Sequence, residues 1–159
     1  MNSTALTTIH MATDHAGYVY KEYIKTFLEQ KGYKVIDHGA YEFDPADDYP
    51  SFVTLAAKAV SKANSDDELG IVLGASGQGE AIAASQFPHI RTTVCYGGPM
   101  AKDIVLAGKA HNNANVLSLG AKFIEEKDVL ELVELWLNTP FTREERHLRR
   151  LHMIEKTEK

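Results

Sequence analysis

The chain has 159 residues, with 17 lysines and arginines against 22 aspartates and glutamates, and a formal charge of −5 at pH 7. This length predicts a single domain over residues 1–159 that can build a stable hydrophobic core without disulfides or structural metal ions. The acidic balance argues against nucleic-acid binding, no apolar run could span a membrane, and the single cysteine excludes an internal disulfide. Because the first residues also lack the pattern of a secretory signal, we expect a cytoplasmic protein.

Short apolar runs alternate along the chain with segments whose apolar side chains recur at helical spacing. Strands are predicted at 8–13, 34–38, 69–73, 92–96 and 116–119. Helical stripes fill 20–28, 52–63, 79–87, 99–110 and 129–137. A capping-box pattern at 142–145 predicts a last, arginine-bearing helix over 142–157. Residues 1–7 precede the first strand, and the sequence leaves their order open.

Five strands separated by helices predict an α/β fold in which a mostly parallel five-stranded sheet has helices on both faces and a C-terminal helix follows. In such sheets ligands bind beyond the C-terminal ends of the strands. Four turns follow strands in this way: 14–17, 74–80, 96–98 and 120–122.

The turn after the third strand reads Gly-Ala-Ser-Gly-Gln-Gly-Glu over residues 74–80. Its three glycines let backbone N–H groups approach a ligand beside the positive end of a helix, which suits an anion or a developing oxyanion. The spacing fits neither a dinucleotide fingerprint nor a P-loop nor a hydrolase elbow. A tight turn without any ligand is the alternative.

Glu80 lies in the first turn of the helix that follows, where a carboxylate is also common simply because it favours the helix dipole. A carboxylate beside an oxyanion-binding turn is what proton abstraction next to a carbonyl requires. The carboxylate takes the C–H proton, and the N–H donors stabilise the enediolate oxygen. Ser76 could supply a further hydroxyl donor.

Two histidine segments and an arginine pair are further candidates. Asp14 and His15 follow the first strand, and His111 with Asn112 precedes the fifth, so we expect all four at the active edge of the sheet. An imidazole suits the transfer of hydroxyl protons near neutral pH. Capping or turn roles are the plainer alternatives.

Arg146 and Arg150 share one face of the last helix because they are four residues apart. Two guanidinium groups side by side can clamp a small phosphate, although an ordinary solvated face is the usual reading of such charge. The basic residues of this helix are too few for a nucleic-acid surface.

Five stretches of the sequence together resemble the family of ribose-5-phosphate isomerase B and galactose-6-phosphate isomerase. They span nearly the whole chain, at 14–17, 47–50, 74–84, 111–115 and 146–150. The resemblance implies a Rossmann-like three-layer α/β/α sandwich and a homodimer or homotetramer with active sites at the subunit interface. It also implies interconversion of aldose and ketose phosphates without a metal or cofactor, and no nucleic-acid or membrane partner.

The resemblance also implies roles for individual residues. The catalytic set would be the base Glu80, the enediolate-stabilising Ser76, the sugar-orienting Asp14 and the ring-opening His111. Substrate binding would involve His15, Gly77, Gly79, Asn112, Lys122, Arg146 and Arg150. Many members place a cysteine base at the position of Gly74, so this chain resembles the glutamate branch. Lys122 stands where that branch has a phosphate-binding arginine. The lysine keeps the positive charge but lacks the forked guanidinium group that can donate two parallel hydrogen bonds.

The leading hypothesis is isomerisation of D-ribose 5-phosphate and D-ribulose 5-phosphate through ring opening and an enediolate, as in the pentose phosphate pathway. A six-carbon aldose phosphate, such as allose or galactose 6-phosphate, is a rival substrate. A sugar-phosphate binding module without turnover, or a purely structural flavodoxin-like domain, belongs to a different class. The sequence does not decide between dimer and tetramer, or which subunit supplies each group.

Overall fold

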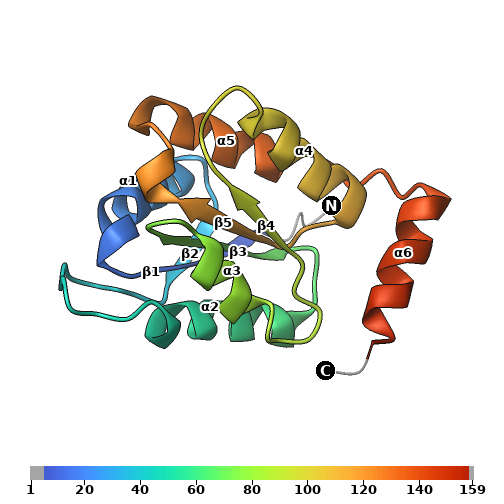
Figure 1. Cartoon of the computed structure of the whole chain (residues 1–159), viewed down its shortest axis with the longest axis horizontal. Helices are drawn as coiled ribbons and strands as arrows, with labels where there is room; N and C mark the ends of the chain where they lie inside the picture. The colour runs from blue at the N-terminus through green and yellow to red at the C-terminus, as the bar shows by residue number, and fades with distance from the viewer. Residues whose placement is uncertain (1–5, 158–159) are drawn as a thin grey trace.

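Within residues 6–157, which this computed structural model describes, the apolar runs form one five-stranded sheet (Figure 1). All four strand pairings are parallel, in the order β2-β1-β3-β5-β4, so the predicted α/β sheet is confirmed. The strands are β1 (Thr8–Thr13), β2 (Lys34–Asp37), β3 (Glu68–Gly74), β4 (Thr92–Cys95) and β5 (Val116–Gly120). Because β1 and β3 are neighbours in this order, the residues that follow them, from 14 and from 75 onward, begin side by side at the carboxyl edge of the sheet.

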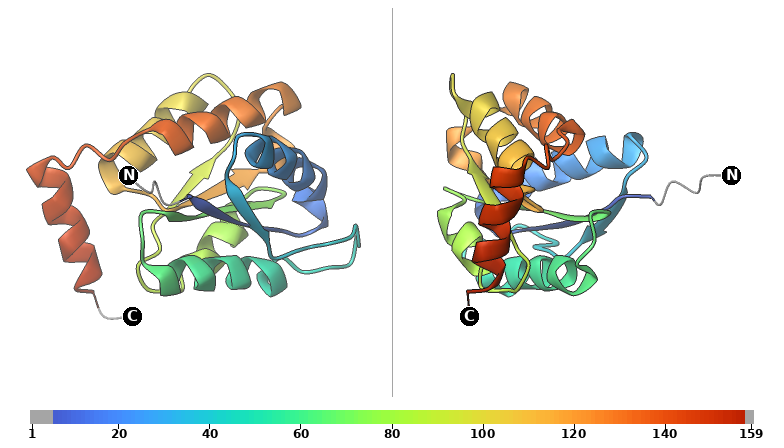
Figure 2. Two further views of the ribbon diagram at one scale, coloured as in Figure 1. Left: turned by 180° about the vertical axis from the view of Figure 1, so that it is seen from behind. Right: turned by 90° about the vertical axis from the view of Figure 1, so that its right-hand side faces the viewer.

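Helices cover both faces of the sheet, which completes the three-layer sandwich (Figure 2). The apolar stripes predicted between the strands become α1 (Tyr18–Gln30), α2 (Pro50–Ala63), α3 (Gln78–Ala84), α4 (Ala101–Asn112) and α5 (Glu126–Asn138), with short 3-10 turns η1 (His15–Gly17) and η2 (Ala121–Phe123). Helices α1, α4 and α5 pack on one face, and α2 and α3 on the other. Among residues 6–157 no helix is long and apolar enough to cross a membrane.

The central strand β3 contributes side chains to the hydrophobic cores on both faces of the sheet. Its side chains alternate between the faces, so Ile71 and Leu73 pack with α1 and α5, whereas Val72 packs with α2. All three are fully buried, as expected for a parallel strand covered on both sides. Trp136 of α5 fills the first core and is also inaccessible to solvent.

The last helix, α6 (Glu145–Glu155), begins three residues later than predicted. The capping-box interpretation was wrong, because the backbone N–H and the hydroxyl of Thr142 both donate to the carbonyl of Ala110, at 3.0 and 2.9 Å. Arg143 then takes a left-handed φ of 54°, which a helix cannot continue through. The connection carries α6 away from the sandwich, where it stands apart from the sheet (Figures 1 and 2).

The question of order in residues 1–7 falls mainly on residues 1–5, which lie outside the described residues. Thr7 lies within them and is tied to the sheet, because its carbonyl accepts a 3.2 Å hydrogen bond from the N–H of Lys34. The described chain is therefore hydrogen-bonded to the sheet already at the residue before β1.

Truncation of Leu117 to alanine should lower the free energy of unfolding by about 3 kcal/mol, because this side chain is fully buried in β5 and its loss leaves a cavity. Val19 of α1 is 70% exposed, so Val19→Ala is the matched control and should stay within about 0.5 kcal/mol of the parent. Urea unfolding followed by circular dichroism measures both. Equal losses in the two variants would contradict this core.

Candidate active site

The carboxyl ends of β1 and β3 meet at one edge of the sheet, and the first candidate residues follow directly from them. Thr13 pairs with Leu73, and its hydroxyl donates to the Leu73 carbonyl at 3.0 Å. Asp14 comes next, is 8% exposed, and accepts a 2.9 Å hydrogen bond from the N–H of Ala16. This bond caps η1 and fixes the carboxylate at the edge where ligands of parallel sheets bind.

Glu80 is a second buried carboxylate at this edge, at 4% exposure. Its side chain lies back over Gly74, where a Cβ would overlap the oxygen Oε1, so only glycine leaves room for it at the end of β3. Burial raises the pKa of Glu80, and the negative charge of Asp14 raises it further, whereas backbone N–H groups at Gly77 and Glu80 partly oppose these effects. A carboxylate with a raised pKa is a stronger proton acceptor than an exposed one.

The glycine-rich turn between β3 and α3 is held in place at several points. Gly77 adopts a left-handed φ of 73°, and its carbonyl accepts a 2.6 Å hydrogen bond from the buried hydroxyl of Ser118. The carbonyl of Ala75 accepts from the N–H of Lys122 at 3.1 Å. The turn therefore has a fixed shape in which backbone N–H groups at the start of α3 lie beside Glu80.

Ser76 and Lys122 also lie at this edge. The Ser76 hydroxyl accepts a 3.2 Å hydrogen bond from the N–H of Gln78, which leaves its own proton free to serve a ligand. Lys122 lies in η2, directly after β5, and its side chain is exposed. Six of the predicted residues besides Glu80 thus share one edge: Asp14, His15, Ser76, Gly77, Gly79 and Lys122.

Two tyrosines belong to this edge although the sequence analysis gave them no role. The hydroxyl of Tyr49 lies against Gly79, where a Cβ would overlap it, so it sits beside the first turn of α3. The hydroxyl of Tyr96 accepts a hydrogen bond from the side-chain amide of Gln78. Tyr49 stands within the stretch 47–50 that carries part of the family resemblance, which was the available signal for it.

His15 is joined to Asp47, which arrives from the loop before α2. The backbone N–H of His15 and its ring atom Nδ1 lie 2.9 and 2.7 Å from the same oxygen, Oδ1 of Asp47. This hydrogen bond raises the pKa of His15 despite some desolvation, with further contributions from the charges of Asp14 and Asp44. Among residues 6–157, Asp14, His15 and Asp47 form the one group whose ligand atoms, within 4.8 Å of one another, could hold a metal. Two of these potential ligand atoms, Nδ1 of His15 and Oδ1 of Asp47, are already hydrogen-bonded to each other.

The remaining predicted residues lie at the opposite edge of the sheet. Helix α4 runs back from the end of β4 to the start of β5, so His111 and Asn112, in its last turn, lie near the amino end of that strand. The seven residues of β3 span about 20 Å between the two edges. The expectation that His111 and Asn112 lie at the active edge of the sheet was therefore wrong within a single chain, because a helix that connects parallel strands runs antiparallel to them.

Helix α6 meets this second edge at a pair of stacked histidine rings. The rings of His111 and His147 stack, with centroids 4.6 Å apart and planes 9° from parallel. His147 is 4% exposed, burial lowers its pKa, and its Nε2 is buried without a hydrogen-bond partner among the described residues. The two predicted phosphate ligands, Arg146 and Arg150, are exposed on the same helix, and Arg146 pairs with Glu144 at 2.8 Å.

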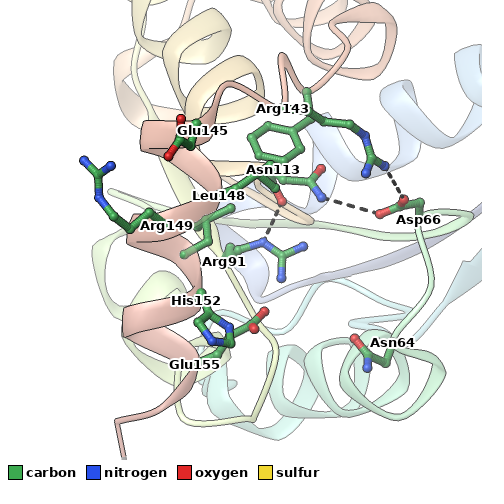
Figure 3. A pocket seen from close by; sticks show the side chains of 12 residues that line it. Asn64, Asp66, Arg91, Asn113, Arg143, Glu145, Leu148, Arg149, His152 and Glu155 are labelled. Atoms are coloured by element: carbon green, nitrogen blue, oxygen red, sulfur yellow. Dashed lines mark hydrogen bonds and ion pairs between the residues drawn. The ribbon is translucent and has the colours of Figure 1, made fainter.

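Beyond that contact, α6 and the sandwich flank an open pocket of about 650 Å³ (Figure 3). Charged side chains line it, and Figure 3 shows Arg143 reaching Asp66, while Arg91 donates to the carbonyl of Asn113 at 2.8 Å. None of the predicted site residues lines the pocket. It instead separates α6 from the body of its own chain.

The chain is similar to known proteins over almost its whole length. Residues 9–154 match a family model described as Ribose/Galactose Isomerase. Ribose-5-phosphate isomerase B of Mycolicibacterium paratuberculosis is 35% identical over 95% of this chain and 91% of its own. The solved structure of ribose-5-phosphate isomerase B from Mycoplasma genitalium, described with bound ribulose-5-phosphate, superposes with a TM-score of 0.87 at 33% identity over 94% of each chain. A ribose 5-phosphate isomerase from Thermotoga maritima gives 0.85 at 33% identity, over 95% of this chain and 99% of that one. The chain therefore belongs to the ribose/galactose isomerase family.

Proposed function

We propose that this chain is a cytoplasmic aldose-ketose isomerase that interconverts D-ribose 5-phosphate and D-ribulose 5-phosphate. The observation that carries the proposal is the buried carboxylate of Glu80 beside a fixed glycine-rich turn at the carboxyl edge of the sheet. The names of the relatives support the substrate, since one of them is described with bound ribulose-5-phosphate.

In the proposed reaction Glu80 removes the proton from C2 of the open-chain aldose, and the electron pair of that bond forms the enediolate double bond. Returning the proton to C1, while a hydroxyl proton moves between O2 and O1, yields the ketose. The raised pKa of Glu80 suits this task, because the acid form must give the proton back. The N–H groups of the turn and the Ser76 hydroxyl would stabilise the enediolate oxygen.

The chain would bind the rest of the substrate at the same edge. Asp14 would orient the sugar hydroxyls, and the cations His15 and Lys122 would attract the phosphate. Ring opening would need His111, with Asn112 near the reacting hydroxyls, but both lie at the far edge of the same subunit. A complete site therefore requires those groups from a second copy.

We infer a homodimer in which each site combines the carboxyl edge of one subunit with His111, Arg146 and Arg150 of the other. Two observations support it. Helix α6 stands away from its own sandwich, and its apolar side chains Met153 and Ile154 are 65% and 62% exposed. Such an arm is suited to packing on a partner, and a two-fold axis would make both sites equivalent.

Replacement of Glu80 by glutamine should lower kcat about 1,000-fold, within the range by which a positioned base accelerates proton transfer. The assay follows ribose 5-phosphate in deuterated buffer by NMR, which shows both ketose formation and label at the transferred position. The wild type should produce labelled ketose. Near-normal turnover by Glu80→Gln would refute the base. A folded wild type active only on six-carbon phosphates would favour the rival substrate, and silence on both would favour the binding module.

Replacement of Gly74 by alanine should also abolish turnover, because the added Cβ occupies the space of the Glu80 carboxylate and pushes the base out of place. Gly70→Ala in the same strand is the control, since its Cβ would meet Val116 Cγ2 at 3.1 Å, a contact that a small shift relieves. Measurement of kcat for both folded variants tests the idea. Equal activity in the two would show that Glu80 does not act from this position.

Mixing two inactive variants tests the shared site. Unfolding and refolding Glu80→Gln together with His111→Ala in equal amounts should restore about a quarter of wild-type activity, because half of the dimers are mixed and each has one intact site. Each variant refolded alone is the control. No recovery from a mixture proven to contain mixed dimers would place Glu80 and His111 in separate functions.

A further inference from the structure

Asp47 belongs to a largely exposed loop, yet it is hydrogen-bonded to both the backbone and the ring of His15. The residue comes from the segment between β2 and α2, 32 positions along the chain, yet its side chain is only 9% exposed. One oxygen, Oδ1, accepts from both the backbone N–H and ring Nδ1 of His15. Two contacts to consecutive parts of one residue fix the imidazole ring as well as the backbone that carries it.

The second oxygen of Asp47 is buried and has no hydrogen-bond partner among residues 6–157. A buried carboxylate oxygen without a donor is destabilising, and folded proteins rarely retain one for stability alone. A neutral side chain could tie the loop to His15 equally well. The feature that only aspartate provides here is a full negative charge next to the imidazole.

That charge fixes the chemistry of the ring. A carboxylate can only accept, so the proton of the shared hydrogen bond resides on Nδ1, and Nε2 is the nitrogen left for another partner. Other charged groups facing His15 are Asp14 at the end of β1 and Asp44 in the same loop, and both are negative. The edge of the Phe43 ring lies against the imidazole, with centroids 6.2 Å apart. Without a cation among them, these carboxylates would repel a phosphate dianion.

We propose that Asp47 is a positioning residue that keeps His15 protonated on both nitrogens, so that Nε2–H meets the phosphate of the substrate as a cationic donor. The proposal rests on the proposed function in one respect, that His15 contacts the phosphate. It adds that the affinity for the anion depends on Asp47, a residue that does not itself touch the substrate. Protonation of His15 then both offsets the neighbouring carboxylates and supplies a hydrogen bond.

The direction of the pH effect follows from the raised pKa of His15. With Asp47 present, the pKa of the imidazole lies above its ordinary value of 6.5, whereas Asp47→Asn removes the largest of the causes that raise it, so the pKa of His15 should be lower in the variant. At pH 7.5 only about a tenth of an unperturbed imidazole is charged. The two proteins should therefore differ at pH 7.5 and converge at pH 5.5, where both are protonated.

The probe is inorganic sulfate, whose charge does not change between these two pH values, titrated calorimetrically into the full chain. Asp47→Asn should bind sulfate about tenfold more weakly at pH 7.5 and about equally at pH 5.5. Histidine NMR, assigned with His15→Gln, should show a lower pKa for His15 in the variant. Asp44→Asn is the matched control, because it removes a charge from the same loop without touching the ring, and it should change both values little.

Two results would overturn the proposal: an unchanged titration of His15 in Asp47→Asn, or a loss of sulfate affinity that is equal at both pH values. The latter would show a purely structural tie. Neither measurement uses turnover. A protein that binds sulfate as expected but does not isomerise sugar phosphates would refute the proposed function and leave the role of Asp47 standing.

Discussion

The arrangement at the carboxyl edge of the sheet depends on one steric constraint. Gly74 has no side chain, and the carboxylate of Glu80 occupies the space that a Cβ would fill. The end of a central parallel strand is fully enclosed, so a carboxylate reaches it only where the strand itself leaves room. Burial then raises the pKa of Glu80, and the fixed turn supplies N–H groups beside it.

The direction of the crossover helices determines how the other groups are distributed. Every helix that links parallel strands returns from one edge of the sheet to the other, so a residue at the end of α4 lies far from one that follows β3. His111 is exposed, and its ring stacks on that of the buried His147, which links the end of α4 to α6, the helix that stands away from the body. If the reaction needs groups from both edges, as proposed, one chain carries the two parts of the site at opposite edges, and a symmetric dimer is the simplest way to bring them together.

Much of the fold could be predicted from the sequence, because alternation and helical spacing mark each strand and each core helix. The glycine-rich turn and the carboxylate after it also follow from the rule that ligands bind at the carboxyl edge. The start of α6 could not be predicted, since Thr142 bonds to the distant carbonyl of Ala110 in place of capping its own helix. The contact of Asp47 with His15 was equally out of reach, because nothing local in a loop indicates which residue 32 positions away it will meet.

The position of α6 also determines which subunit of a dimer a substitution in this helix would affect. If its arginines serve the partner's site, a substitution on α6 leaves the subunit that carries it well folded and impairs its neighbour instead. A cell with two versions of the gene would then make mixed particles whose two sites differ, and a defective arm would reduce the output of normal subunits. Selection for catalysis would then act on Arg146 and Arg150 as well as on the buried strands, although exposed side chains of this kind contribute little to the stability of their own domain.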